Sequence, residues 1–188
     1  MATQGIPVCG EWRIIEKCAY TDEVLSDRTI YNLVVLSGQE MICRFLFGFG
    51  GASSIVGLGV GASSTYNTVA SSGVSVNDTR LTYELTGNAT RKALTNTNNV
   101  SLSVADFTQE ITTVGSTTYY SKITVQSQFA AGDGNNGNTF QEYGLFDTLV
   151  LPSSPTASSG TMFNRLVDPA PITKTASNSL TVQVTLRF

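Results

Sequence analysis

The sequence contains no histidine, few charged residues and no long apolar run. Without histidine, Ser–His and Cys–His catalytic pairs, most zinc chemistry and the usual general base near neutral pH are excluded. The eleven Lys and Arg residues are scattered, so the basic stripe that a nucleic-acid-binding protein needs is absent. No apolar run approaches the roughly 18 residues of a membrane-spanning helix, and the first residues lack the pattern of a signal peptide. We therefore expect neither a nucleic-acid nor a membrane partner.

Cysteine is scarce as well. The chain has an odd number of cysteines, Cys9, Cys18 and Cys43, and no two of them have CxxC spacing. This argues against a disulfide scaffold and against a structural zinc site. We expect reduced, partly buried thiols, while a Cys9–Cys18 bridge stays open if the protein ends up outside cells. We expect no metal and no other cofactor.

The residues that are present favour strands. Charged residues make up 13% of the 188-residue chain, against roughly 25% in an ordinary globular protein. Uncharged residues take their place. Thr suits strands, and Ser, Asn and Gly suit the turns between strands. The composition therefore predicts an all-β protein with little charge on its surface. Uncharged polar faces cost less to bury against a partner, because no ion has to be desolvated.

Period-two alternation supports this prediction along the chain. The stretch that ends at Phe188 alternates large apolar residues with Thr, Gln and Arg, as expected of a strand with one buried and one wet face. In 117–129, Ile123, Val125 and Phe129 share one face in the same way. We expect further strands at 11–20, 54–64, 100–107, 140–151 and 161–168, with a break at 169–171, whereas 79–94 is ambiguous between helix and strand.

One helix is predicted. Ser37 is followed three residues later by Glu40, which is the spacing of a capping box, and apolar residues continue at helical spacing. The glycines that follow Phe47 end the pattern, so we expect a helix at about 38–47. The fold predicted is an antiparallel, jelly-roll-like β-sandwich over residues 31–188, with residues 1–30 forming an N-terminal arm or a first strand.

Three motifs that suggest chemistry fail on inspection. GLGVGASS at 57–64 lacks the lysine and the spacing of a phosphate-binding loop. GDGNNGNTFQE at 132–142 resembles a calcium loop, but Gly137 and Gly144 stand where ligands belong and Asn138 stands where the turn glycine belongs, so a loop between strands is the better interpretation. Glu142 and Asp147 lie five residues apart, so on one extended strand they would point to opposite faces and could not act as a catalytic pair. We expect no catalytic residue.

Several segments, in this order, resemble small structural proteins of tailed bacteriophages. They are NLVVLSGQEMICRFLFG, IVGLGVGASS, TRLTYELTGNATRKAL, FQEYGLFD and the closing TMFNRLVDPAPITKTASNSLTVQVTLRF. The resemblance covers residues 31–188. It implies that EYGLF is a core strand, that the terminal strand pairs close to it, and that Lys174 lies where that strand begins. Four charged positions fall inside the matching segments, and we expect them to form buried or half-buried ion pairs that fix strand register: Glu84, Arg91, Glu142 and Arg165.

The resemblance implies a non-enzymatic virion protein. A capsid decoration (cement) protein is the leading hypothesis, with the major capsid protein and further copies of the chain, in a trimer, as partners. It would be made in the host cytoplasm and located on the capsid surface. A tail, baseplate or fibre component is the alternative. Trp12, Ile14 and Ile15 are the predicted partner-binding residues, because aromatic and aliphatic anchors carry most interface energy. A carbohydrate-binding module, for which Tyr119 and Tyr120 are the only candidate platform, is a second alternative.

Overall fold

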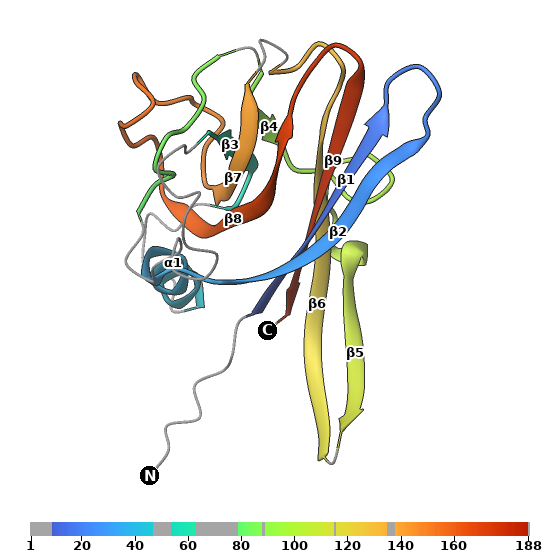
Figure 1. Ribbon diagram of the computed structural model, residues 1–188. Coiled ribbons are helices and arrows are strands. Elements are labelled where there is room, and N and C mark those ends of the chain that lie inside the picture. The colour runs from blue at the N-terminus through green and yellow to red at the C-terminus, as the bar shows by residue number, and fades with distance from the viewer. Residues whose placement is uncertain are drawn as a thin grey trace.

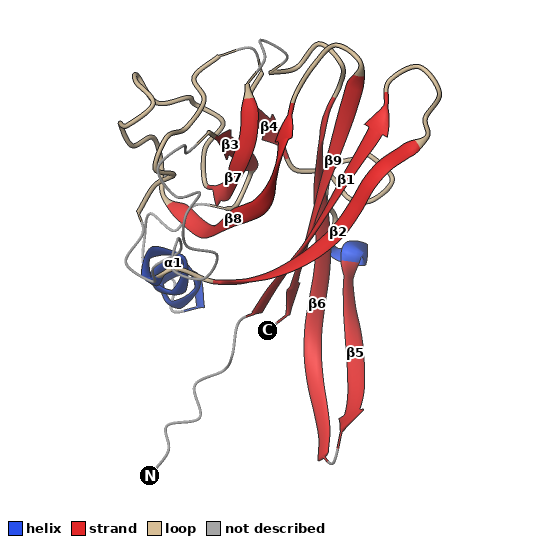
Figure 2. Cartoon of the chain, viewed as in Figure 1, coloured by secondary structure: helices blue, strands red, loops and turns tan. Residues whose placement is uncertain are grey.

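Two antiparallel β-sheets face each other, with one short helix at their margin (Figure 1 and Figure 2). The computed structural model describes residues 9–46, 54–62, 79–87, 89–114, 116–134 and 138–187. Within these ranges one sheet has five strands in the order β2-β1-β9-β6-β5, and the other has four in the order β4-β3-β7-β8. The all-β sandwich with one short helix that the sequence predicted is confirmed.

The elements have the following bounds. The five-stranded sheet contains β1 (Cys9–Cys18), β2 (Val24–Leu33), β5 (Phe107–Val114), β6 (Ser116–Phe129) and β9 (Asn178–Arg187). The four-stranded sheet contains β3 (Gly57–Gly61), β4 (Arg91–Ala93), β7 (Thr139–Phe146) and β8 (Met162–Thr173). The helix α1 covers Leu36–Leu46, and a short 3-10 helix, η1, covers Val104–Asp106.

The five-stranded sheet follows the alternation of its sequence. Along β9 buried and half-buried residues alternate without exception from Asn178 to Arg187. In β6 the predicted Ile123, Val125 and Phe129 are buried. One face of this sheet therefore packs into the core of the sandwich, and the other face carries the polar half of each strand.

The two sheets are also joined at both margins by isolated bridges. At one margin Val34, just after β2, pairs with Asn164 of β8. At the other margin Thr95, just after β4, pairs with Gln126 of β6. The main core between the sheets is therefore enclosed on both sides, and β5 remains outside this closed arrangement.

The four-stranded sheet is buried on both faces. All five residues of β3 and all but the first residue of β7 are buried. The face turned away from the main core carries a second, smaller apolar cluster, which consists of Val35, Leu81, Phe146 and Met162. The apolar runs IVGLGV and EYGLF arise for this reason, because a strand covered on both faces has no wet side to mark with polar residues.

Helix α1 is close to the predicted 38–47, but its first turn is built differently. The helix begins at Leu36, so Ser37 is inside the helix rather than its cap. The hydroxyl of Ser37 donates to the carbonyl oxygen of Met162 (2.6 Å), which ties the helix to β8. A Cβ atom at Gly38 would collide with the carbonyl oxygen of Phe163. The predicted capping box is therefore wrong, and the glycine lets the helix lie directly on the backbone of β8.

Other local predictions also need correction. Residues 100–107 are not a strand, because Val104–Asp106 forms the 3-10 helix and β5 begins at Phe107. The segment 169–171 does not break the chain, since β8 continues through both prolines to Thr173. The ambiguous stretch 79–94 contributes only the three residues of β4.

Cys18 and Cys43 are free thiols, and a Cys9–Cys18 bridge is excluded because these residues are the two ends of the ten-residue strand β1.

The N-terminal segment is a first strand and not a separate arm over its described length. β1 lies between β2 and β9 and pairs with β9 along its whole length. A boundary at residue 30 falls inside β2. Residues 9–33 are thus part of the sandwich, and residues 1–8 are outside the described ranges.

Candidate functional site

Four charged residues form two buried ion pairs on the outer face of the four-stranded sheet: Glu84, Arg91, Glu142 and Arg165. The guanidinium group of Arg91 binds the carboxylate of Glu84 through two hydrogen bonds, from Nε to Oε1 (2.8 Å) and from Nη2 to Oε2 (3.0 Å). The exposed fractions of the two side chains are 0% and 1%. This pair is therefore a fully buried, bidentate ion pair, as expected for a planar guanidinium group on a carboxylate.

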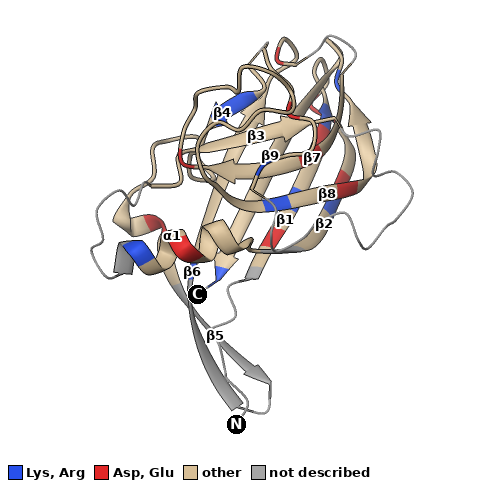
Figure 3. Cartoon of the chain, turned by 90° about the vertical axis from the view of Figure 1, so that its left-hand side faces the viewer, with Lys and Arg blue, Asp and Glu red and all other residues tan. Residues whose placement is uncertain are grey.

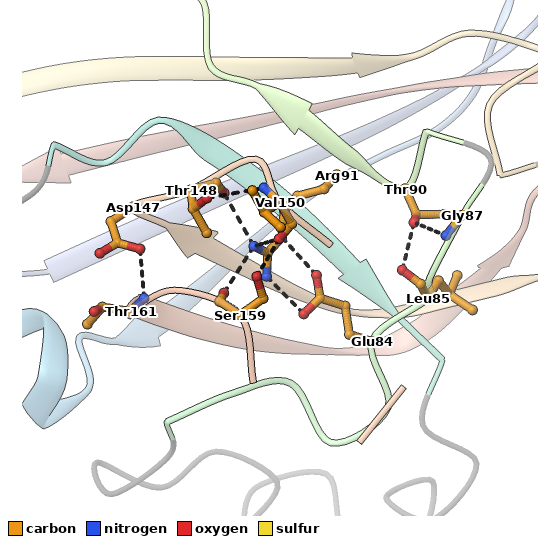
Figure 4. A network of polar contacts seen from close by, with 10 residues as sticks. All are labelled: Glu84, Leu85, Gly87, Thr90, Arg91, Asp147, Thr148, Val150, Ser159 and Thr161. Atoms are coloured by element: carbon orange, nitrogen blue, oxygen red, sulfur yellow. Dashed lines mark hydrogen bonds and ion pairs between the residues drawn. The ribbon is translucent and has the colours of Figure 1, made fainter. Parts of the chain in front are cut away.

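Arg91 also holds the loop between β7 and β8. Its Nη1 donates to the carbonyl oxygens of Val150 (2.7 Å), Ser159 (3.1 Å) and Thr148 (3.3 Å), as Figure 4 shows. Its Cζ lies 3.8 Å from the centre of the Phe146 ring. One side chain thus fixes a loop of the chain whose contact points lie more than fifty residues away in sequence.

The glycines of β3 make room for this pair. A Cβ at Gly59 would come within 3.0 Å of Glu84 Oε1 and within 3.4 Å of Arg91 Nε. The alternating glycines of GLGVGASS are therefore explained by close approach of buried side chains and backbone, and no phosphate has to be invoked. Burial raises the pKa of Glu84 above its ordinary value, and the hydrogen bonds and charge of Arg91 oppose this effect.

A second ion pair lies on the same sheet. Arg165 Nη2 is 3.1 Å from Glu142 Oε2, and the exposed fractions of these side chains are 2% and 0%. Both residues also hold Thr82, since the backbone N–H of Thr82 donates to Glu142 Oε2 (2.6 Å) and Arg165 Nη2 donates to Thr82 Oγ1 (2.7 Å). The expectation of buried ion pairs among these four charged positions is confirmed, and each pair fastens a covering segment to the sheet.

Two further charged groups connect the sheets. Arg28 of β2 binds the buried Asp168 of β8 and also donates to the carbonyl oxygen of Ala170 (2.6 Å). Lys174 is buried, but it directly follows β8 and lies four residues before β9 begins at Asn178, so the expectation that it lies where the terminal strand begins is wrong. Its Nζ donates to the carbonyl oxygens of Asn178 (2.6 Å), Thr175 (3.1 Å) and Ala131 (3.4 Å), and burial lowers its pKa. The Arg28–Asp168 pair was missed because a pair formed 140 residues apart leaves no local pattern.

The predicted partner-binding residues are divided by the fold. Trp12 and Ile14 have exposed fractions of 0% and belong to the main core, where the Trp12 ring lies 6.3 Å from that of Tyr143. Ile15 points to the opposite face of β1 and is half-buried. Trp12 and Ile14 are therefore corrected to core residues, because residues two apart on a strand share a face and this face is turned inwards.

The other candidate residues either form separate structural contacts or have side chains outside the described residues. Asp147 Oδ1 accepts from the backbone N–H of Thr161 (2.7 Å), whereas Glu142 belongs to its own ion pair. Asp133 binds Lys92 (2.7 Å) in the loop that the calcium motif had suggested. The side chains of Tyr119 and Tyr120 lie outside the described residues. Within the described ranges no group of three or more metal-ligating side chains is present, and no helix there is long and apolar enough to cross a membrane.

The outer face of the five-stranded sheet is the candidate interaction surface. Its centre is a ladder of uncharged side chains, in which Thr124 and Thr185 hydroxyls lie 2.9 Å apart and Gln183 donates to Gln126 (3.1 Å). On the neighbouring strands charges are paired, with Arg13 bound to Asp27 (2.6 Å) and Arg187 to Glu11 (2.9 Å).

Charge is mixed elsewhere too. Figure 3 shows both signs on β1, on β8 and on α1, with each sign interrupted by the other. A partner would therefore meet the half-buried Thr124, Gln183 and Thr185 at the centre of the outer face and paired charges beside them, whereas Gln126 is buried.

Comparisons with known proteins add no further identification. A scan against protein-family models finds no match, and searches of curated proteins and of solved structures find none either.

Proposed function

We propose that this chain is a non-enzymatic structural protein of a tailed-phage virion, and that it acts as a capsid decoration (cement) protein. The observation that carries the proposal is the convergence of the phage-like segments on the two buried ion pairs. Four of those segments supply the two ion pairs and the glycine that leaves room for one of them: Gly59, Glu84, Arg91, Glu142 and Arg165. Both ion pairs hold covering segments on the four-stranded sheet, and this rigidity suits a structural protein.

The attachment surface is the outer face of the five-stranded sheet. Its centre offers the half-buried side chains of Thr124, Gln183 and Thr185, which can exchange water for a partner without desolvating an ion. A chain with 13% charged residues should bind the capsid through shape and neutral hydrogen bonds. The partners are the major capsid protein and further copies of this chain, and the location is the capsid surface.

The test uses purified protein and particles that lack it. We expect attachment to survive about 1 M salt, where the screening length falls to roughly 3 Å and a charge-steered complex would weaken. The variant Thr181→Glu/Gln183→Glu, which places two like charges on the outer face, should abolish attachment without unfolding the protein. Ser153→Glu/Ser158→Glu, in an exposed loop, adds the same charge elsewhere and should attach normally.

The runner-up is a tail, baseplate or fibre component. Gold-labelled antibody against the chain distinguishes the two locations by electron microscopy, because label confined to the tail would refute the cement hypothesis. Deleting residues 1–20 cannot test an anchor, since it removes the central strand β1. Deleting residues 1–8 is the informative truncation: normal attachment of this shorter protein would show that no N-terminal anchor is needed.

A further inference from the structure

The sheets have four edges, and three of them are protected against pairing with another chain. β4 has three residues, and the chain beyond it is bridged to β6 through Thr95. β8 carries Pro169 and Pro171 in its second half, and β2 binds it through Arg28 and through the Val34–Asn164 bridge. The same contacts cover the edge of β2. Short strands, proline, charge and covering segments are the devices by which soluble proteins block edge-to-edge association.

The fourth edge, formed by β5, has no proline and only one charged residue, and no described segment covers it. β5 contains eight residues, it pairs with β6 without a register shift, and it lacks proline. In the sequence from 109 to 121 the single charged residue is Glu110. No described strand pairs with the outer edge of β5, so its backbone N–H and C=O groups are available to a partner strand, with almost no charge to discourage one.

The same hairpin has a second open edge. β9 pairs with β6 only from Lys122 to Phe129, whereas β5 pairs with β6 back to Ser116. Residues 109–114 and 116–121 thus form a two-stranded ribbon that continues beyond β9, and Figure 1 shows it extending away from the sandwich. We call these residues the β5–β6 ribbon. Among the described residues no third strand pairs with this ribbon, and a two-stranded ribbon by itself is marginally stable in water, so its regular pairing points to a partner.

We propose that the β5–β6 ribbon is the self-association element of this protein, and that it pairs edge to edge with the ribbon of a second copy. A second copy fits because both open edges belong to one chain, so each ribbon offers an acceptor and a donor strand for its neighbour. Near-neutral ribbons also approach one another without like-charge repulsion. Pairing the outer edge of β5 with the β6 edge of the next copy is heterologous, and such pairing gives a ring where the rotation from copy to copy closes. This inference adds the contact between copies to the structural role proposed above.

The experiment uses the purified full-length chain without particles. We expect sedimentation to show a closed oligomer, and the variant Ile111→Lys/Thr113→Lys to sediment at the mass of one chain, 20.0 kDa, with an unchanged far-UV circular dichroism spectrum. Ser153→Lys/Ser158→Lys adds the same two charges in an exposed loop and should remain oligomeric. A wild-type protein that is monomeric at every concentration would overturn the proposal, as would a lysine variant that keeps the full oligomer.

Hydrogen exchange supplies a second measurement that does not depend on a variant folding. In the wild-type protein, amides of 109–114 and 116–121 should become protected as the protein concentration rises, because pairing with a second copy occupies the open edges. Oligomers whose ribbon amides exchange as fast as those of the monomer would refute the assignment. A monomer that still decorates capsids would refute the ribbon inference alone, and an oligomer that binds no particle would refute the proposed function alone.

Discussion

The two sheets of this protein use the same charged residue types in opposite ways. On the five-stranded sheet the Arg13–Asp27 pair has exposed fractions of 50% and 35%, and on the four-stranded sheet the Arg91–Glu84 pair has 0% and 1%. The difference follows from how many faces of each sheet are covered. A sheet with one wet face can leave its ion pairs in water, where they contribute little, whereas a sheet covered on both faces must satisfy every charge inside the protein.

The comparison also separates two kinds of stabilisation. The five-stranded sheet is held by apolar burial along β1, β6 and β9. The four-stranded sheet adds a layer of loops that the buried Arg residues fasten down. A variant in either region should therefore fail in a different way, and four predictions test this from the largest expected effect to the smallest.

The largest effect should come from the core of the five-stranded sheet. Trp12→Ala removes a fully buried indole from the centre of the sandwich and should lower the free energy of unfolding by about 3–5 kcal/mol. Ile15→Ala on the opposite, half-buried face of the same strand is the control and should cost clearly less. Urea unfolding monitored by far-UV circular dichroism, rather than by tryptophan fluorescence, measures both losses. Equal losses would show that Trp12 is not a core residue.

The buried ion pair is the next test. Arg91→Met should cost about 3–5 kcal/mol, because it leaves Glu84 buried without its partner and three loop carbonyls without their donor. The matched change Arg13→Met breaks an exposed pair and should cost less than about 1 kcal/mol. Proteolysis should also cut the loop 148–160 faster in the Arg91 variant. If the two variants unfold at the same denaturant concentration, the contrast between the sheets is mistaken.

A smaller effect is expected where the glycine of β3 admits the pair. Gly59→Ala brings a methyl group within 3.0 Å of both Glu84 and the Phe146 ring, and overpacking of this kind costs about 1–3 kcal/mol. At Gly132 an added Cβ meets nothing within 4 Å, so Gly132→Ala should leave the melting temperature nearly unchanged. A Gly59 variant as stable as the wild type would mean that the two side chains can move apart freely.

The smallest effect is a difference in pH dependence. Burial raises the pKa of Glu84 in the folded state above its ordinary value of 4.5. The folded state then holds this proton more tightly than the unfolded state, so the contribution of Glu84 to stability is fully present below that value. It is lost as the pH rises through the raised pKa. The stability of the wild type relative to Glu84→Gln should therefore fall as the pH rises through this window.

Asp27 should show the opposite slope. The hydrogen bonds from Arg13 lower the pKa of Asp27 below its ordinary value of 3.8. Its contribution is present above that value and is lost as the pH falls through the lowered pKa. The stability of the wild type relative to Asp27→Asn should fall on acidification, and two slopes of the same sign would contradict the assignment of buried and exposed pairs.

The sequence alone determined the local features of this protein. Strict alternation in 178–187, and apolar residues on one face of 117–129, defined strands with one apolar face, because a strand turns successive side chains to opposite sides. The helical spacing after Ser37 located α1 to within two residues at its N-terminus. The motif order also pointed to the four residues of the two buried ion pairs. The strand and helix predictions depend on residues that are neighbours in the chain, whereas the four charged residues were selected by a resemblance of successive segments.

Only the tertiary structure decided what lies on each face. Whether Trp12 points into the core or towards a partner depends on which side of β1 the second sheet covers, and alternation is identical in both cases. The pairing of Arg91 with Glu84, of Arg165 with Glu142 and of Arg28 with Asp168 follows from strand order and register. These contacts join segments up to 140 residues apart, and their geometry arises from the packing of one sheet on another, which a local pattern does not encode.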